Sequence, residues 1–322
     1  MSDLLKPNRL KVSVIIPVYN GENYVIQCLE SVLNQTYKNY EVLIINDGSK
    51  DNSSTIVQNF INLRQVSDNF RIITTKNFGV SHARNLGLTN AIGDILAFLD
   101  CDDTWERNKL LKQVQSLEQN SDCIGSITNF FIVKQNANKS FRKIRLISHQ
   151  SILGLRNGWF SLEGNGGLIS STLMMRNLGI FRFNSSLSTG ADLEFFLKVC
   201  KAGNILIIKE PLVNYRLHSN QMHLNSEGLT KDCEYLISQM TKLNLNLKIS
   251  AVRGNVFAMA SLLEFAKGNY SDGFNFLQKS VHSNLFSPLR ICISVIFKRV
   301  CGLYRLYYWK YLKSPFFPHR ED

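Results

Sequence analysis

The sequence predicts an α/β fold built on a doubly wound sheet, with a helical appendage towards the C-terminus. Three observations predict it. Strand-like and helix-like segments alternate four times in roughly the first hundred residues, the strand-like segments are mostly apolar, and the chain after about residue 221 has helical patterns only. Continuous apolar strands are typical of parallel sheets that are buried on both faces, and such sheets bind ligands beyond the carboxyl ends of their strands.

The N-terminal elements follow from apolar runs and the polar residues that end them. The first strand is the β-branched run Val12–Val18, which ends near Asn20 and Gly21. Strands are expected at Val12–Val18, Glu41–Ile45, Arg71–Thr74 and Asp94–Leu99, and helices at Tyr24–Leu33, Ser54–Leu63, Val80–Asn90 and Leu110–Glu118. The polar stretch Asp51–Ser54 suits the start of the second helix, because its side chains accept hydrogen bonds from free backbone N–H groups.

The rest of the chain is less regular. We expect in order a strand Ile127–Val133, a basic loop Lys139–Arg145, a glycine-rich turn at Gly164, Gly166 and Gly167, a helix Leu193–Cys200, a short strand Ile205–Ile208 before Pro211, and helices Tyr235–Leu247, Val256–Lys267 and Gly273–Val281. This predicts an α/β domain over residues 1–220, a helical extension over 221–284 and a tail over 285–322.

Composition limits the compartment and the partners. A net charge of +12 indicates anionic partners such as nucleoside diphosphates, lipid headgroups or nucleic acid. The seven scattered cysteines contain no CxxC pair, which is typical of a reducing compartment. The N-terminus lacks the pattern of a signal peptide, and no apolar run reaches the roughly 18 residues that cross a bilayer. We therefore expect a cytoplasmic protein.

The tail combines basic and aromatic residues. The segment Leu289–Lys313 holds six lysines and arginines, no acidic residue, and aromatic residues such as Tyr307, Tyr308 and Trp309. This composition suits a helix that lies in the headgroup plane of an anionic membrane. The alternative is a helix docked on the protein with a solvated basic face. We favour peripheral contact with the inner face of the cell membrane.

Three carboxylates follow the fourth predicted strand. Asp100, Asp102 and Asp103 lie together at a strand end, where like charges repel unless a cation binds between them. Oxygen ligands without nearby histidine or cysteine favour Mg²⁺ or Mn²⁺, which complete their coordination with substrate phosphates. The alternative is a cap for a helix that begins near Trp105, but a cap needs one acid rather than three.

Two further strand ends carry polar motifs. Asn46–Ser49, with Asp51, follows the second strand, and by itself this is equally well a turn. Asn77–Leu88 leads from a glycine loop into a helix that carries Arg84, and by itself this is an ordinary capped helix.

Together, the three motifs resemble the family-2 glycosyltransferases of the GT-A fold over Val12–His218. The resemblance implies a GT-A type doubly wound mixed sheet flanked by helices. It implies that Asp47 holds the donor's base and Asp100 its ribose, and that Asp102 with Asp103 holds Mn²⁺ or Mg²⁺. It also implies a set of donor-binding residues, which are Pro17, Tyr19, Asp47, Asn77, Arg84, Asp100, Arg216 and His218.

On the acceptor side, Thr189–Leu197 resembles the family's acidic pair and helix, which makes Asp192 the general base. Without the resemblance, Asp192 is more simply a helix cap. Tyr215–His218 is similar to the family's element near the diphosphate. The sequence departs from the family at Asn46 and Ala191, where many members have an acidic residue, and it lacks the GlnXXArgTrp element of processive synthases, so polymerisation is not expected.

The resemblance implies an inverting hexosyltransferase that moves a sugar from a nucleoside diphosphate donor, with UDP expected, to an acceptor hydroxyl. A lipid-linked saccharide in cell-surface polysaccharide synthesis is the expected acceptor. A nucleotidyltransferase needs a glycine-rich basic loop where Tyr19–Asn23 stands, and no nucleic-acid-binding module is visible. A non-catalytic sugar-nucleotide binder remains an alternative.

Overall fold

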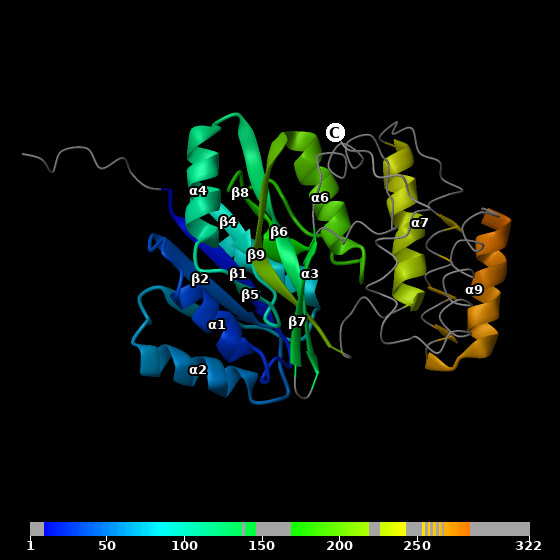
Figure 1. Cartoon of the computed structure of the whole chain (residues 1–322), viewed down its shortest axis with the longest axis horizontal. Helices are drawn as coiled ribbons and strands as arrows, with labels where there is room; N and C mark the ends of the chain where they lie inside the picture. The colour runs from blue at the N-terminus through cyan, green and yellow to red at the C-terminus, as the bar shows by residue number, and fades with distance from the viewer. Residues whose placement is uncertain are drawn as a thin grey trace, which may run out of the picture. The chain divides into compact units, whose positions relative to one another are not determined.

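The chain is described by a computed structural model. It covers residues 10–136, 139–145, 169–218, 226–242, 253–254, 257, 260–261, 264–265 and 267–283. The chain divides into two compact units, Met1–Leu247 and Lys248–Asp322. The first unit contains the sheet, whose elements are labelled in Figure 1.

Four parallel strands form the N-terminal half of the sheet. They are β1 (Val12–Val18), β2 (Tyr40–Asn46), β3 (Phe70–Thr74) and β4 (Ile95–Phe98), in the order β3-β2-β1-β4. Val18 pairs with Asn46, and Asn46 pairs with Thr74, so β1, β2 and β3 end level with one another, while β4 ends opposite Ile15 of β1. Each lies within one residue of its predicted position at either end. The loops that follow them therefore share one edge of the sheet.

The sheet continues beyond β4 with mixed directions. It adds β8 (Met174–Arg176), β6 (Cys123–Asn136), β9 (Asn204–Leu217) and β5 (Thr104–Trp105), while β7 (Lys139–Arg145) pairs with β6. Strand β8 is antiparallel to both β4 and β6, and β9 is parallel to β6. Strands β6 and β9 consequently run in the same direction as β4, and β9 ends at the edge where β1, β2 and β4 end. The predicted mixed, doubly wound sheet is confirmed.

Helices flank this sheet, as predicted. They are α1 (Val25–Leu33), α2 (Ser53–Arg64), α3 (Val80–Asn90), α4 (Lys109–Gln119), α6 (Ala191–Ala202) and the 3₁₀ turn η1 (Ser170–Thr172). Helix α7 (Ser226–Lys242) follows β9 along the chain. Helix α3 packs against β1 and β2, α1 packs against α2, and α4 packs against β6. Their apolar faces close the core from outside the sheet.

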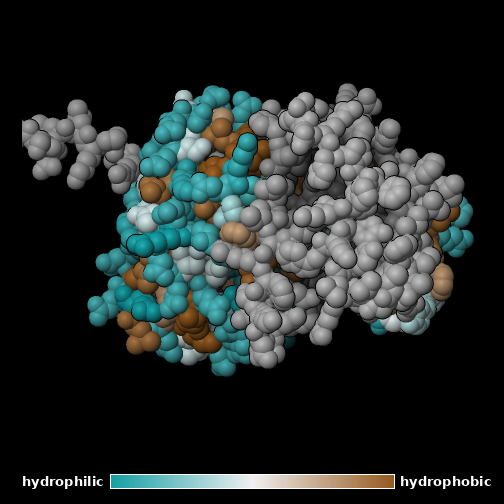
Figure 2. Space-filling view, viewed as in Figure 1, coloured by the Kyte–Doolittle hydropathy of each residue, from teal (hydrophilic) through white to brown (hydrophobic). Residues whose placement is uncertain are grey.

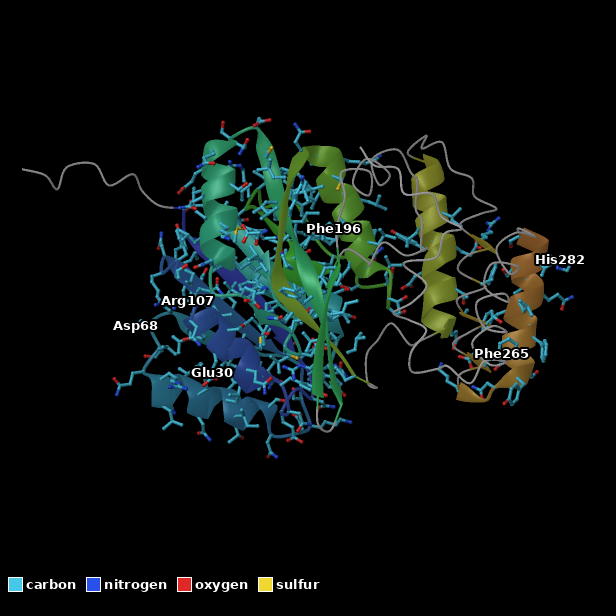
Figure 3. All side chains as sticks on the ribbon, viewed as in Figure 1. Glu30, Asp68, Arg107, Phe196, Phe265 and His282 are labelled. Atoms are coloured by element: carbon cyan, nitrogen blue, oxygen red, sulfur yellow. The ribbon has the colours of Figure 1, made fainter. Side chains whose placement is uncertain are left out.

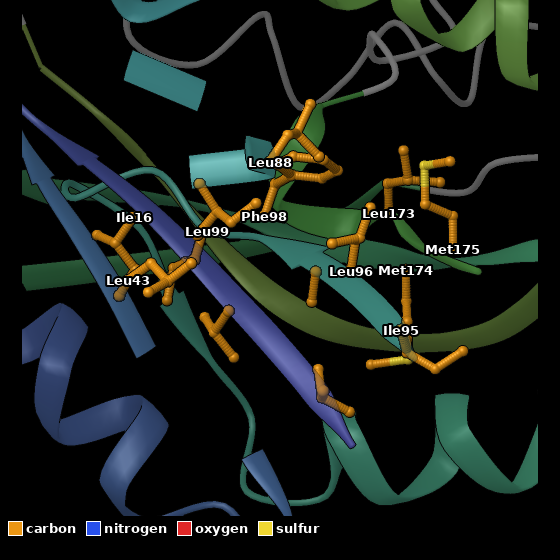
Figure 4. Packing of buried hydrophobic residues seen from close by; sticks show 14 of the residues in the cluster. Ile16, Leu43, Leu88, Ile95, Leu96, Phe98, Leu99, Leu173, Met174 and Met175 are labelled. Carbon is orange, nitrogen blue, oxygen red and sulfur yellow. The ribbon is translucent and has the colours of Figure 1, made fainter. Parts of the chain in front are cut away.

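The core lies between the strands and these helices. Every residue of β1 and β2 is buried. Figure 4 shows Ile16, Leu43 and Phe98 within the cluster that also contains Met174 of β8. Burial of this apolar surface is the main force that holds the loops at the sheet edge in place. Hydrophilic residues cover much of the coloured surface in Figure 2, and the charged side chain of Asp68 points outwards in Figure 3.

Two predictions in the middle of the chain are wrong. The segment Lys139–Arg145 is not a loop but β7, because the long strand β6 offers it an antiparallel partner. The strand predicted at Ile205–Ile208 continues through Pro211 to Leu217. Irregular pairing between β6 and β9 around Asn129 absorbs the proline, which has no N–H to donate to the ladder.

Other predictions missed an element or its start. The short strands β5 and β8 were not predicted, because two or three residues give no periodic signal. Helix α7 begins at Ser226 rather than at Tyr235. The glycine-rich turn at Gly164, Gly166 and Gly167, residues 243–247 and the tail Leu289–Lys313 lie outside the described residues.

The second unit contains α9 (Tyr270–Ser283), which begins three residues before the predicted Gly273. Ser261 Oγ donates to the carbonyl oxygen of Gly273 at 2.7 Å, and Ser280 Oγ donates to that of Gly254 at 2.7 Å. These bonds tie α9 to the preceding segment. Among the described helices, none combines the length and apolar character that a membrane span needs. The domain limits at 220 and 284 stay predictions.

Candidate functional site

The carboxyl edge of the sheet gathers most of the predicted residues. Tyr19 follows β1, Asp47 follows β2, and the acidic cluster Asp100–Asp103 follows β4. The end of β9 brings Arg216 to the same edge. Residues more than a hundred positions apart are therefore in direct contact, as their hydrogen bonds demonstrate.

The acidic cluster does not cap a helix. Thr104 and Trp105, which follow it, form strand β5, and the next helix begins at Lys109. The alternative interpretation of these carboxylates as a helix cap is wrong for this reason. Their side chains instead face Arg84, His218 and two serines.

Arg84 joins two carboxylates from distant parts of the chain. Its Nη1 donates to Asp192 Oδ1 at 2.5 Å, and its Nη2 donates to Asp100 Oδ1 at 2.6 Å. The side chain is only 4% exposed. Burial opposes the charge of the guanidinium, but the two carboxylates outweigh it and raise the pKa of Arg84. Arg84 is thus a fixed cation between the acidic cluster and α6.

Asp192 lies in the first turn of α6 without capping it. Gly190 is the N-cap residue of the helix, and no side chain makes a capping hydrogen bond there. The Asp192 carboxylate is instead paired with Arg84 and is 29% exposed. Burial raises the pKa of Asp192, while Arg84 acts in the opposite direction. This is a partly accessible carboxylate with a fixed orientation, which the helix-cap alternative did not anticipate.

Aromatic packing holds α6 against the sheet. The ring of Phe195 on α6 stacks on Phe183, with centroids 3.9 Å apart, and meets Phe98 of β4 edge to face. Phe183 also lies under the Arg84 guanidinium at 5.1 Å. Asn85, the residue after Arg84, exchanges two hydrogen bonds with the backbone of Phe183. The helix that carries Asp192 and the helix that carries Arg84 therefore share one support.

Asp102 pairs with the end of β9. Its Oδ2 lies 2.9 Å from His218 Nε2, and the His218 ring stacks on Tyr24 of α1. Its carbonyl oxygen accepts a bond from Arg216 Nε at 3.0 Å. Burial and the neighbouring Asp100 raise the pKa of Asp102, although His218 acts to lower it. The Asp102 carboxylate remains 24% exposed.

Asp103 has a different environment. It is 1% exposed, its Oδ2 accepts a bond from Ser171 Oγ at 2.7 Å, and its Oδ1 accepts one from the backbone N–H of Arg216 at 3.1 Å. Burial and the charges of Asp102 and Asp100 raise the pKa of Asp103 well above its usual range. Both of its oxygens thus bond to protein groups. To bind a metal ion, Asp103 would have to exchange these partners.

The turn η1 (Ser170–Thr172) was missed by sequence reasoning. Ser170 Oγ accepts from Arg84 Nη2 at 2.8 Å and donates to Asp100 Oδ2 at 3.1 Å. Ser171 Oγ bonds to Asp103 and to the backbone N–H of Asp100, and its carbonyl accepts from Trp105 Nε1. A run of three hydroxyl residues between apolar ones was the available signal. It supplies uncharged donors that a buried acidic cluster requires.

Asp47 shapes the loop before α3. Its two oxygens accept bonds from the backbone N–H groups of Phe78 at 3.0 Å and Gly79 at 2.8 Å. The neighbouring Gly48 has a φ of +69°, and a Cβ there would lie 2.8 Å from the backbone nitrogen of Asn77. Only glycine fits this turn, so the two predicted motifs pack directly on each other.

The remaining predicted donor residues differ in accessibility. Pro17 is buried in β1 and pairs with Ile45 of β2, whereas Tyr19 is 42% exposed. Asn77 is exposed in the loop beside Gly48. Tyr19 and Asn77 can therefore meet a ligand at the sheet edge, while Pro17 can act only through the shape of its strand.

The chemistry of the cluster fits a divalent cation. Asp102 offers an accessible carboxylate oxygen with a histidine nitrogen beside it. Burial and the charge of the neighbouring Asp100 raise the pKa of Asp102, so a cation beside Asp102 would stabilise its ionised form. Among the described residues, no group of three or more side chains could enclose a metal ion. A divalent cation at this place would be held by one or two side chains together with phosphate oxygens of a substrate.

Residues 13–183 match the sequence model of glycosyl transferase family 2. The matched segment contains Asp47, Arg84 and the acidic cluster. It ends before Asp192, Arg216 and His218.

Among relatives, an uncharacterized glycosyltransferase of Rickettsia felis is 32% identical over 260 residues, which are 75% of this chain and 40% of that protein. One of Rickettsia typhi is 26% identical over 272 residues, which are 80% and 81% of the two chains. This chain thus spans less than half the length of some relatives. The structure of Staphylococcus aureus TarS 1-349 in complex with UDP-GlcNAc superposes with a TM-score of 0.58 at 18% identity, over 88% of this chain and 83% of that one.

Proposed function

The chain belongs to glycosyl transferase family 2, and from that membership we propose that it moves a sugar from a nucleoside diphosphate donor to an acceptor hydroxyl, with inversion. The observation that best supports the proposal is the pair of salt bridges made by Arg84. One joins it to Asp100 of the acidic cluster and the other to Asp192 of α6. One buried guanidinium thus joins Asp100 to the carboxylate that we propose as the general base. Because Asp100 and Asp192 bond to the same side chain, a donor beside Asp100 and an acceptor beside Asp192 would lie close together at the carboxyl edge of the sheet.

The donor would lie along the loops after β1, β2 and β4. Its base would meet Tyr19 and the loop that Asp47 holds, since Asp47 is 2% exposed and both of its carboxylate oxygens accept backbone bonds, and its ribose would meet Asp100. Arg84 is buried, so we propose that it acts on the nucleotide chiefly by fixing Asp100. The TarS structure binds UDP-GlcNAc, which favours a UDP-sugar, and with it a hexosyl group, as the donor here.

The diphosphate would lie near Asp102, Arg216 and His218. We propose Asp102 as the main ligand of Mg²⁺ or Mn²⁺, because the predicted second ligand, Asp103, already accepts two hydrogen bonds. A cation bound there would supply positive charge to stabilise the leaving diphosphate. Arg216 and His218 add donors on the same side, and Asp103 fixes the backbone of Arg216.

Asp192 would act as the general base. Its carboxylate accepts the proton of the acceptor hydroxyl while that oxygen forms its bond to the anomeric carbon. The bond to the diphosphate breaks, and its electron pair leaves with the diphosphate. One displacement of this kind inverts the anomeric centre through an oxocarbenium-like transition state. In place of the acidic residue missing at Ala191, Arg84 orients the Asp192 carboxylate.

We propose a lipid-linked saccharide at the inner face of the cell membrane as the acceptor, within cell-surface polysaccharide synthesis. The support is the basic, aromatic segment Leu289–Lys313, which suits an anionic lipid surface. The alternative is a soluble acceptor, which transfer assays with a panel of acceptors would identify.

The test is turnover across a panel of nucleotide sugars, with and without Mn²⁺, for the wild type and Asp102→Ala. We expect release of nucleoside diphosphate from one donor, dependent on metal and lost in Asp102→Ala. The matched control is Asp68→Ala, a surface aspartate on the loop before β3. Metal-dependent binding of a donor without turnover, over a full acceptor panel, would favour the non-catalytic binder, and release of pyrophosphate would favour a nucleotidyltransferase.

A further inference from the structure

Helix α7 holds the loop that leads into Asp192. Asp232 of α7 is 2% exposed, and its Oδ2 accepts bonds from three consecutive backbone N–H groups. These belong to Ser188 at 2.8 Å, Thr189 at 2.5 Å and Gly190 at 2.8 Å. The hydroxyls of Ser188 and Thr189 lie 3.3 Å and 3.2 Å from the same oxygen.

This arrangement is strong and specific. Successive N–H groups that converge on one oxygen form a concave site for an anion, and bonds to a carboxylate are stronger than bonds between neutral groups. The loop lies at the N-terminus of α6, where a negative charge is also favoured by the helix dipole. Asp232 therefore fixes the position of three successive peptide groups.

The close approach of the two helices depends on Gly190. A Cβ at this position would lie 3.0 Å from Leu236 Cδ1 and 3.1 Å from Asp232 Cβ. Leu236 belongs to the same buried cluster as Phe195 of α6. A side chain at position 190 would therefore require Leu236 or Asp232 of α7, or the loop itself, to shift by a few tenths of an ångström, even with the Asp232 carboxylate present.

We propose that Asp232 is a positioning residue for the general base, an inference that rests on the proposed function of Asp192. Two contacts restrain the position of the Asp192 carboxylate. Arg84 holds its oxygen from the α3 side, and Asp232 holds its backbone two residues upstream from the α7 side. The helix beyond the family-matched segment is thus part of the catalytic apparatus rather than a separate appendage. Displacement of a reacting group by about 1 Å costs on the order of 100-fold in rate.

The experiment compares Asp232→Ala, Asp232→Asn and Gly190→Ala in the full chain, with Glu227→Gln as the control. Glu227 is an exposed acid in the first turn of α7. We expect Asp232→Ala to lower kcat for sugar transfer by about 10- to 100-fold, with the donor Kd unchanged. Asp232→Asn retains an accepting oxygen and should recover part of kcat, and Gly190→Ala should lower kcat with every charge in place.

Hydrogen exchange of the amides of Ser188, Thr189 and Gly190 gives a second readout that needs no activity. We expect protection in the wild type and in Glu227→Gln, and its loss in Asp232→Ala at a temperature where the protein stays folded. Absence of wild-type turnover would refute the proposed function but leave this exchange test intact. Wild-type kcat in Asp232→Ala, or unprotected amides in the wild type, would overturn the positioning role.

Discussion

At the scale of single residues, the site depends on carboxylates whose charges are compensated unequally. Asp192 and Asp100 share the buried Arg84, whereas Asp102 has a histidine and Asp103 has only uncharged donors. This inequality gives neighbouring aspartates different roles. Asp100, Asp102 and Asp192 are partly exposed and can meet a substrate or a metal ion. The buried Asp103 instead holds the backbone N–H of Arg216.

The pH dependence of transfer should reveal the Arg84 pair. A base must be ionised, and Arg84 favours the ionised form of Asp192, so its removal raises the pKa of Asp192 further. We expect Arg84→Gln to move the acid limb of the kcat/KM profile upward by about 1 to 3 pH units, the size of shift that an adjacent opposite charge produces. The control is Arg182→Gln, since Arg182 bonds to carbonyl oxygens near Phe181. An acid limb at the wild-type pH in Arg84→Gln would mean that Arg84 does not favour the ionised form of the general base.

At the scale of elements, the turn η1 supports the acidic cluster. Its serines hydrogen-bond to Asp100 and Asp103, and its backbone accepts a bond from Trp105. The strand end after β4 is thereby joined to the segment before β8. Loss of one serine hydroxyl of η1 should therefore destabilise both the strand end after β4 and the segment before β8.

We expect Ser171→Ala to lower the free energy of unfolding by about 1 to 3 kcal/mol, because a buried carboxylate loses a donor. The raised pKa of Asp103 means that the folded state binds its proton more tightly than the unfolded state. Its contribution to stability is therefore full below the unfolded pKa and is lost as pH rises through the folded pKa. Ser171→Ala extends that loss, so its deficit should grow with pH.

Chemical denaturation at pH 5 and pH 8 measures this, with Ser238→Ala as the control. Ser238 Oγ donates to the carbonyl of Tyr235 on the exposed side of α7, so its loss should change stability by less than about 0.5 kcal/mol. A Ser171→Ala protein as stable as the wild type would mean that Ser171 does not support Asp103.

How well the sequence predicts an element depends on how many residues carry its hydrophobic pattern. The continuous apolar runs of β1 and β2 and the pattern of α3 define their elements closely, so Asp47, Arg84 and Asp100 could be placed at one edge in advance. The short β5, β8 and η1 carry no periodicity, and their partners are distant in sequence. The contacts between Arg84 and Asp192 and between Asp232 and the loop before α6 likewise depend on tertiary packing, which no local pattern encodes.

At the scale of the whole molecule, the described site residues all lie in the unit Met1–Leu247. Helix α7 belongs to the unit that holds the site, whereas the basic, aromatic segment Leu289–Lys313 belongs to the sequence of the second. Under the proposed function, this segment would contact the lipid surface at which the acceptor lies.

This assignment predicts vesicle binding. The full chain should sediment with vesicles that contain anionic lipid, and binding should weaken as salt screens the charges. Removal of residues 285–322 should abolish binding while donor hydrolysis continues. The control replaces the two lysines Lys198 and Lys201 of α6 with glutamine, which lowers the charge outside the tail. Undiminished vesicle binding without residues 285–322 would contradict the assignment.

The most direct test of the account measures donor binding and sugar transfer side by side for the wild type and Asp192→Asn. Asparagine preserves the size of the side chain but cannot take the proton from the acceptor. We predict an unchanged donor Kd and a kcat for transfer reduced by about 100- to 10,000-fold, the contribution typical of a general base. Transfer at the wild-type rate in Asp192→Asn would contradict the account, because the base would then lie elsewhere.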